Sequence, residues 1–343
     1  MTSLLLGIAL SLAVLFVVLL ATIVVRRALA DRRRRRDAGL RPGIELAVVE
    51  YLAAEDAPAP ALADDPGTRR LLGMIAVGMI GELRGRERDR LVALLERTQI
   101  VGETAAELGS RRRPRRRLAA ETLRRIASAD AAPALVVATQ DPDLDTRLTC
   151  AAALAELADT DPIAGVLDLA DAAAMERPGA VAAILVTLGR RHPGALGDAL
   201  ALGRSSELRR LAAAVVGELR VAEHAEALRD ALADPDDELV ARAARGLGMI
   251  GDAGAVDALL TLAETRERAW FVRIAATGAL GELGDERALA PLERGLREDG
   301  WTAQAKAARA LRSLGGPGEA VLREALDSPV QTVREHASVA LGA

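Results

Sequence analysis

Three histidines and one cysteine are the residues of this chain best suited to bind a metal ion or to act as a nucleophile. They are His192, His224, His336 and Cys150, and no two of them have the spacing of metal ligands. A single cysteine cannot form a disulfide within the chain, which suits a reducing compartment. The sequence therefore predicts no metal site and no cofactor.

Neighbouring carboxylates could instead act as a general acid and a general base. The two clearest pairs are Asp141 with Asp143 and Asp236 with Asp237. Each lies beside a proline where an amphipathic pattern begins, which is typical of a helix N-terminus. The sequence has no nucleophile elbow, zinc-protease motif or glycine-rich phosphate loop. We therefore interpret these acids as helix caps and expect no enzyme activity.

Two groups of arginines could bind anions. The N-terminal arginine cluster comprises Arg32, Arg33, Arg34, Arg35 and Arg36. The central arginine cluster comprises Arg111, Arg112, Arg113, Arg115, Arg116 and Arg117. Both could contact anionic lipid or an acidic partner, or could simply be solvated, with the first serving as a topology signal. The sequence disfavours nucleic acid as a ligand, because the distal part of the chain is acidic and no aromatic residues interleave with the arginines.

The elements that position these residues are expected to be helices. Half of the 343 residues are apolar, yet the aromatic residues are only Phe16, Tyr51, Trp270, Phe271 and Trp301. Alanine, leucine and valine must therefore fill the core, and alanine is the best helix former. Strands favour aromatic and β-branched residues, which are scarce as a set outside the N-terminus of this chain. The composition predicts an all-α protein.

Residues 4–25 carry no charge and are mostly apolar, and a helix of this length can cross a hydrocarbon core of about 30 Å. The alternative is a signal peptide cleaved after Ala30, but residues 1–3 contain no basic side chain and the apolar stretch is too long. Arg26, Arg27 and the N-terminal arginine cluster follow at once, and arginines stay on the cytoplasmic side. We therefore expect a single-pass protein of the cell membrane, with its N-terminus outside and the remainder in the cytoplasm.

A segment rich in alanine, leucine and glycine recurs about every 31 residues, which indicates an array of stacked helical units. One interval is longer by about a dozen residues, and this surplus lies near residues 98–114. Each copy has one apolar residue in its last helical turn, and these anchor residues are Ile80, Leu123, Leu154, Leu188, Val216, Leu247, Leu280, Leu311 and Leu341.

The copy that begins at Asp234 shows how a repeat should fold. Asp234 is a suitable N-cap, and Pro235 fits the first helical position. The amphipathic helix that follows should end at Gly251, and a second helix is expected at residues 255–264. The apolar stretch, the arginine bias and the repeat pattern together divide the chain into four parts. They predict a transmembrane helix at 1–25, a basic linker at 26–43, a leading helix and loop at 44–67, and helical repeats at 68–343.

The repeat at residues 272–285 reads VRIAATGALGELGD and resembles the bacterial HEAT repeats of the short subtype also seen in phycobilisome lyases. Val333-Arg334 places the motif arginine in another copy, whereas Gln304 replaces it in a third. The resemblance implies a right-handed α-solenoid of about eight helical pairs. It also implies a non-catalytic scaffold or adaptor that binds a protein, and the predicted membrane anchor favours a membrane-associated partner. The alternative is an enzyme built from HEAT repeats, such as a bilin lyase or a DNA glycosylase.

Trp270 and Trp301 occupy equivalent positions in consecutive repeats. One interpretation is that each ring fills the gap between adjacent units, because tryptophan recurs at this position in the HEAT family. The other is that the two rings form an exposed aromatic edge, since tryptophan is favoured where partners bind most tightly. The sequence leaves both interpretations open.

The resemblance places the second helix of each pair on the concave side of the solenoid. Five acidic residues are expected to be exposed there, about one repeat apart, with Arg294 and Arg297 as a basic interruption. They could bind a basic or helical segment of a partner, or could serve only solubility. The predicted acidic row comprises Asp168, Asp198, Asp230, Asp257 and Glu293.

Overall fold

The computed structural model describes residues 2–53, 65–157, 163–297 and 300–342, and the regular elements of this part are all helical. The predicted all-α fold is therefore confirmed for these residues. Contacts divide the chain into two compact units, residues 1–131 and residues 132–343. Each unit has its own core and is described separately below.

The first unit contains five α-helices and a short 3₁₀ turn at Ala129–Ala131 among its described residues. Ile44, Val48 and Tyr51 of its first helix are buried. Arg90 donates to the carbonyl oxygen of Tyr51 at 2.6 Å and lies over the Tyr51 ring. The α-helices are α1 (Thr2–Ala53), α2 (Pro66–Met79), α3 (Gly85–Arg97), α4 (Ile100–Glu107) and α5 (Arg113–Ile126).

Helix α1 runs without a break through the stretch 26–43, which the sequence predicted as a linker before a separate helix. Arginine, alanine and leucine dominate this stretch and favour helix. Pro42 removes one backbone donor, and the ion pair of Arg41 with Glu45, at 2.6 Å, bridges that turn. Helix α1 therefore crosses the predicted boundary at residue 43, and the loop predicted within residues 44–67 lies mostly outside the described residues.

Upstream of its buried end, α1 exposes a series of large apolar side chains, including Phe16 at 67% of its surface. The side chains of residues 1–14, 17 and 33 are outside the described part, and so is much of the predicted span at 4–25. Over the residues that are described, no helix combines enough length with enough apolar character to cross a bilayer.

The surplus residues near 98–114 form helix α4, which the repeat pattern did not predict. Gln99 adopts a left-handed conformation, with φ of 61°, and lets the chain turn sharply between α3 and α4. Ile100 and Val101 are buried, so this insertion contributes to the core of the first unit.

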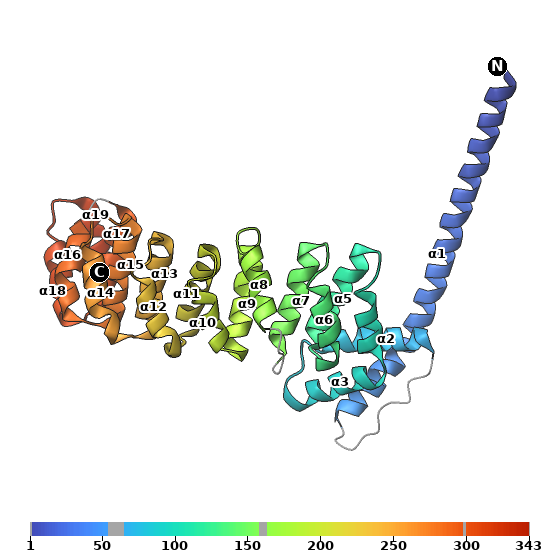
Figure 1. Ribbon diagram of the computed structural model, residues 1–343, viewed down its shortest axis with the longest axis horizontal. Helices are drawn as coiled ribbons and strands as arrows, with labels where there is room; N and C mark the ends of the chain where they lie inside the picture. Colours follow the sequence, from blue (N-terminus) through green and yellow to red (C-terminus); the bar gives the residue numbers. More distant parts are fainter. Residues whose placement is uncertain (1, 54–64, 158–162, 298–299, 343) are drawn as a thin grey trace. The chain divides into compact units, whose positions relative to one another are not determined.

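In the second unit, long helices of 13 or 14 residues alternate with short helices of 7 to 11 residues (Figure 1). Helix α6 (Ala132–Ala138) precedes them and α19 (Gln331–Leu341) follows them. The long helices are α7 (Leu144–Glu156), α9 (Pro178–Arg191), α11 (Ser206–Leu219), α13 (Asp237–Ile250), α15 (Trp270–Leu283) and α17 (Trp301–Ser313). The short helices are α8 (Ile163–Ala173), α10 (Gly194–Leu200), α12 (Ala225–Ala231), α14 (Val256–Glu264), α16 (Leu289–Arg297) and α18 (Gly316–Ala325).

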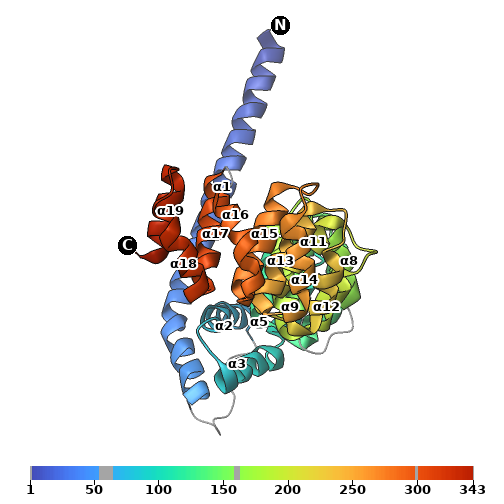
Figure 2. The ribbon, with the colours of Figure 1, turned by 90° about the vertical axis from the view of Figure 1, so that its left-hand side faces the viewer.

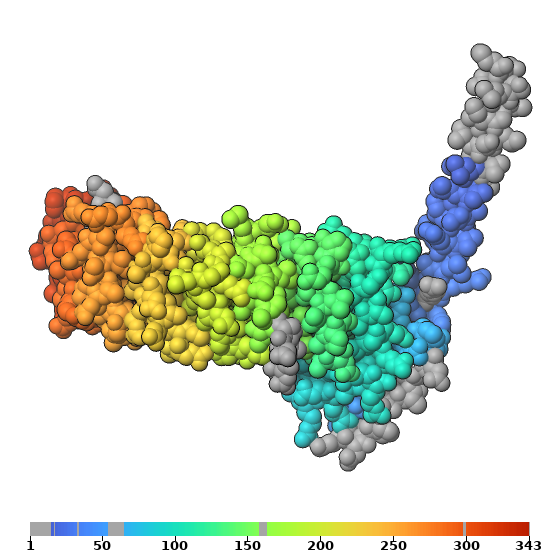
Figure 3. All heavy atoms as spheres, viewed as in Figure 1, coloured from blue at the N-terminus to red at the C-terminus, as the bar shows by residue number. Residues whose placement is uncertain are grey.

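The long and short helices form two layers. Figure 2 looks along the unit and shows α13 and α15 on one side, with α12 and α14 on the other. In the space-filling view the successive repeats pack side by side into one continuous surface (Figure 3). This arrangement is that of an α-solenoid, in which each repeat packs on its neighbours.

Anchor residues and small residues together form the core of the array. All predicted anchor residues except Leu341 are at least 98% buried, and Leu341 is partly exposed. Between the long helices, glycines bring the backbones together. A methyl group at Gly217 would lie 2.6 Å from the Cα atom of Gly246 on the next long helix. The scarcity of large side chains in the sequence therefore has a direct structural role.

The start of α13 differs from the prediction by two residues. Asp236, not Asp234, is the N-cap, and it accepts from the backbone N–H of Glu238 at 3.0 Å. Asp234 instead accepts from the N–H of Asp236 at 2.9 Å and shapes the turn around Pro235. The helix ends at Gly251 in a left-handed conformation, with φ of 84°, as predicted.

The same shift occurs at the other proline turns. Asp143 caps α7, while Asp141 accepts from the N–H of Asp143 at 2.8 Å. Ser328 accepts from the N–H of Val330 at 3.3 Å, just before α19. At these three turns the aspartate or serine before proline shapes the turn and the N-cap follows two residues later, whereas at Pro66 the preceding Asp65 itself caps α2.

Candidate partner-binding surfaces

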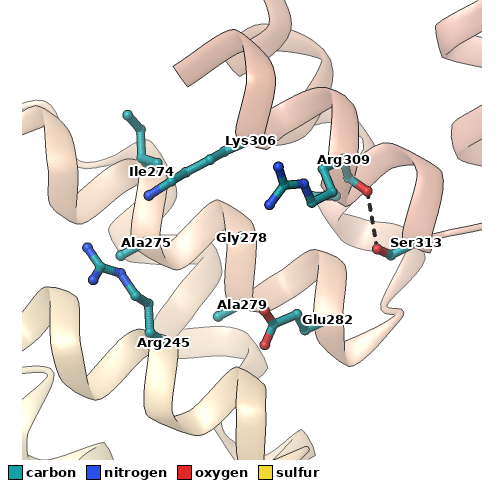
Figure 4. Close-up of a pocket in the computed structure, with 10 residues that line it drawn as sticks. Arg245, Ile274, Ala275, Gly278, Ala279, Glu282, Lys306, Arg309 and Ser313 are labelled. Atoms are coloured by element: carbon teal, nitrogen blue, oxygen red, sulfur yellow. Dashed lines mark hydrogen bonds between the residues drawn. The ribbon is translucent and has the colours of Figure 1, made fainter. Parts of the chain in front are cut away.

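An open hollow of about 210 Å³ is lined by residues of the long helices α13, α15 and α17 (Figure 4). Its floor is made of small residues, because Ala275, Gly278 and Ala279 of α15 lie between larger side chains of the flanking helices. Gly278 has open space where a Cβ atom would be. The remaining residues that line it are Arg245 of α13, Ile274 and Glu282 of α15, and Lys306, Arg309, Ala310 and Ser313 of α17.

Three cationic side chains converge on this hollow. Figure 4 shows Arg245 approaching from one side and Lys306 and Arg309 from the other. Burial, together with the neighbouring Arg245 and Arg309, lowers the pKa of Lys306. Burial also raises the pKa of Glu282, whose carboxylate lies close to the backbone of Gly248. The hollow is thus a site of excess positive charge, formed by three exposed cationic side chains.

Trp270 and Trp301 are the first residues of α15 and α17, and both rings are exposed, at 59% and 61%. More than half of each side chain is therefore open to solvent, which favours the exposed aromatic edge over rings buried in the gaps between repeats. Trp270 contacts Phe271 edge-on, with ring centroids 6.0 Å apart. Trp301 contacts the buried His336 of α19 at 4.3 Å between centroids. Their position at the N-termini of α15 and α17 places both rings on the long-helix layer.

The predicted acidic row lies on five of the short helices, one residue on each. Four of its members are exposed and the fifth, Glu293, is partly buried. The hollow lies on the long helices, whereas the resemblance placed the binding groove on the short ones. In chain order the row is Asp168 on α8, Asp198 on α10, Asp230 on α12, Asp257 on α14 and Glu293 on α16.

Arginines neutralise much of this row. Arg204 lies 2.5 Å from Asp168, and Arg287, from the following repeat, lies 2.8 Å from Asp257. The predicted basic interruption is itself paired, because Arg294 contacts Glu264 at 2.8 Å and Arg297 contacts Glu293 at 2.7 Å. The surface of the short helices therefore carries paired acidic and basic side chains more than a continuous acidic groove.

The two arginine clusters both belong to the first unit. In the N-terminal cluster, Arg36 pairs with Asp65, the N-cap of α2, at 2.5 Å. In the central cluster, Arg115 pairs with Glu107 at 3.5 Å, and Arg116 donates to the carbonyl oxygen of Ser110. The central cluster leads into α5 and remains largely exposed.

The histidines and the cysteine have structural roles. A ring nitrogen of His192 lies 3.1 Å from the carbonyl oxygen of Leu157, and one of His224 lies 2.7 Å from that of Pro193. Burial raises the pKa of the Cys150 thiol to about 12, which disfavours the nucleophilic thiolate. No group of residues able to hold a metal ion occurs among the described residues.

The acid pair Asp236 and Asp237 ties neighbouring repeats together. Arg210 of α11 donates two hydrogen bonds to Asp236, at 2.6 and 2.9 Å. Arg268 donates to Asp237 at 2.8 Å, and the N–H of Ala269 donates to the same carboxylate at 2.9 Å. These hydrogen bonds to Arg268 and Ala269 lower the pKa of Asp237. The interpretation of these acids as structural is consistent with this geometry.

Sequence reasoning missed the cationic hollow. Lys306, Arg309 and Ser313 follow a helical spacing, so their common face on α17 was detectable. Arg245 comes from α13, which lies two long helices away, and only the packing of the array brings it to the same hollow. Periodicity within one helix does not contain that information.

Residues 195–342 match a family model described as HEAT repeats, in overlapping segments at 195–271, 234–312 and 268–342. A search of curated proteins finds no sequence that matches the chain.

Several solved structures have a related fold. A mutant of the karyopherin Kap121p aligns with 87% of this chain and 41% of its own, at 12% identity and a TM-score of 0.54. Kap121p bound to the SUMO protease Ulp1p aligns with 88% of this chain and 41% of its own, at 13% identity and a TM-score of 0.52. YibA of Escherichia coli aligns with 78% of this chain and 94% of its own, at 17% identity and a TM-score of 0.45. The family match assigns residues 195–342 to HEAT repeats, and the two Kap121p structures share the α-solenoid fold of this chain.

Proposed function

We propose that this protein is a non-catalytic scaffold that binds a membrane-associated protein partner on the long-helix layer of its HEAT repeats. The observation that carries the proposal is the exposure of Trp270 and Trp301 at equivalent positions of that layer. Large exposed aromatic rings are costly in water and are enriched where proteins bind one another. Kap121p, which shares the fold, binds the protein Ulp1p in one of its structures, and this supports a similar use of the present array.

The proposed site of action is the cytoplasmic face of the cell membrane. Residues 4–25 carry no charge, and the described apolar side chains of α1 from Leu15 to Val25 are largely exposed. A lipid environment would cover this surface, and the arginines that follow favour a cytoplasmic location. We further propose that the N-terminal and central arginine clusters contact anionic lipid at that face.

A topology measurement tests the membrane proposal. With a reporter fused after Ala343, we expect cytoplasmic fluorescence for a fluorescent protein and no activity for an enzyme that works only outside the cytoplasm. Replacing Arg32, Arg33, Arg34, Arg35 and Arg36 by glutamine should increase the fraction of chains with the opposite orientation, because arginine bias sets topology. Release of the chain after cleavage at Ala30, or recovery of full-length protein without membranes, would contradict the proposal.

A second prediction concerns the partner. In membranes treated with a crosslinker, Trp270→Ala should reduce the yield of the main crosslinked protein by about tenfold or more, because truncating a tryptophan hot spot typically costs at least ~2 kcal/mol of binding. Thermal unfolding should change little, since the ring is mostly exposed. The quantity to measure is the crosslinked product relative to total protein.

The matched control reverses charge on the short helices. Asp198 and Asp230 are exposed and have no ion-pair partner within the described part of the chain, so Asp198→Lys with Asp230→Lys should fold normally. We expect this variant to retain the crosslinked product. Loss of the product in the control and its retention in Trp270→Ala would assign the partner to the short-helix surface.

A further inference from the structure

Three cationic side chains of the hollow form no ion pair with any described carboxylate, in contrast to most arginines of the second unit. Among the described residues, Arg245, Lys306 and Arg309 form no salt bridge. Elsewhere in this unit, arginines such as Arg210 and Arg268 are held by aspartates at 2.6 to 2.8 Å. The positive charge of the hollow is therefore left available for a ligand.

The arrangement brings these charges to one place without filling the space between them. Arg245 and the α17 pair Lys306 and Arg309 lie on opposite sides of α15 (Figure 4). The α15 surface between them contributes no large side chain at Gly278, where a Cβ atom would meet nothing within 4 Å. A group that enters the hollow could thus reach cations from two helices at once.

The electrostatics favour an anionic occupant. Burial and the charges of Arg245 and Arg309 lower the pKa of Lys306, so its ammonium group is held in an unfavourable field. Glu282 lines the same hollow but lies toward Gly248 of α13, and it is one carboxylate against three cations. A ligand that supplies further carboxylates would replace repulsion among the cations by attraction.

We propose that the hollow formed by Arg245, Lys306 and Arg309 binds carboxylates of an acidic peptide segment of the partner. Ile274 lines the hollow, and Trp270 lies one helical turn before it, so the same segment would place an apolar residue beside its acids. This inference rests on the proposed scaffold function and specifies the chemistry of the partner.

A protein segment fits this surface better than a nucleic acid does. The hollow is local, with a volume of about 210 Å³, whereas proteins that hold single strands use a long basic groove that follows the phosphate backbone. The chain has a net charge of −4, and carboxylates remain exposed on its short helices. Both features disfavour the binding of a polyphosphate, but they are compatible with the binding of a short acidic peptide segment.

The single lysine provides a direct probe. Reductive methylation of the full chain in a zwitterionic detergent with ¹³C-formaldehyde labels Lys306 and the α-amine, and Lys306→Arg identifies the lysine signal because it removes it. A peptide rich in glutamate and leucine should shift this signal saturably and raise the pKa of the labelled amine. Its glutamine counterpart should not. Absence of any saturable shift at low salt would overturn the proposal.

Paired variants then locate the site. With the same peptide carrying fluorescein, Arg245→Gln with Arg309→Gln should weaken binding by about tenfold or more, because charge-assisted hydrogen bonds are lost. The control, Arg204→Gln with Arg287→Gln, removes equal charge from ion pairs of the short helices and should change the affinity by less than about twofold. Equal weakening by both pairs would overturn the proposal, since it would indicate attraction by net charge alone.

Two further outcomes separate this inference from the function on which it rests. Tighter binding of a DNA oligonucleotide than of the acidic peptide, lost in the Arg245→Gln, Arg309→Gln variant, would assign the hollow to nucleic acid. Unchanged crosslinking of the partner in that variant, together with its loss in Trp270→Ala, would retain the scaffold and reject the acidic segment.

Discussion

Gly281→Ala is expected to destabilise the second unit by about 2–3 kcal/mol, because overpacking of a close helix contact costs this much. Gly281 of α15 faces α17, and an added Cβ atom would lie 2.4 Å from the Cβ atom and 2.8 Å from the Cα atom of Ala310. The clash involves backbone that no change of side-chain rotamer can relieve. The two helices would have to separate, and the repeats that follow would lose contact.

The matched control lies on the same helix. Gly278→Ala adds the same methyl group where nothing lies within 4 Å, so the gain in helix propensity, about 1 kcal/mol, should dominate. Thermal and urea unfolding of the full chain in a nonionic detergent, followed by circular dichroism, gives both effects. Equal changes in the two variants would show that the close approach of α15 and α17 does not limit stability.

The layout of the repeats was predictable because it depends on local patterns. Leu247 and Leu280 are fully buried where the repeat pattern placed them, and Gly251 ends α13 as predicted. Both features follow from helical periodicity and from the conformational freedom of glycine. The prediction failed at Asp234, since aspartate before proline suits a turn as well as an N-cap, and only the hydrogen bonds distinguish the two.

The candidate surfaces were predictable only in part. Exposure of Asp257 follows from its place on a short amphipathic helix, but its pairing with Arg287 depends on how consecutive repeats stack. The same holds for the hollow, where Arg245 and Lys306 come from helices that are separated by α15. The small residues at the helix contacts set the distances between repeats. These distances cannot be read from the sequence of a single repeat.

Asp234→Asn is expected to cost about 3 kcal/mol, within the range found when one partner of a buried ion pair is removed. Arg209 lies 2.7 Å from Asp234, and each side chain is only 9% exposed. Asparagine can still accept from the N–H of Asp236 and keep the turn. The loss of stability therefore measures the effect of removing the negative charge alone. Arg209 would retain its hydrogen bond to the carbonyl oxygen of Leu200 but would be a buried cation without a counter-charge.

Two further variants determine whether the unpaired charge is the cause. Asp257→Asn breaks a pair of similar length, 2.8 Å, in which the aspartate is 88% exposed, and it should cost less than about 0.5 kcal/mol because water screens such pairs. Adding Arg209→Met to Asp234→Asn removes the buried cation and should restore part of the stability, since an apolar side chain needs no counter-charge there. If the double variant unfolds as easily as Asp234→Asn, the loss comes from the turn around Pro235 and not from the charge of Arg209.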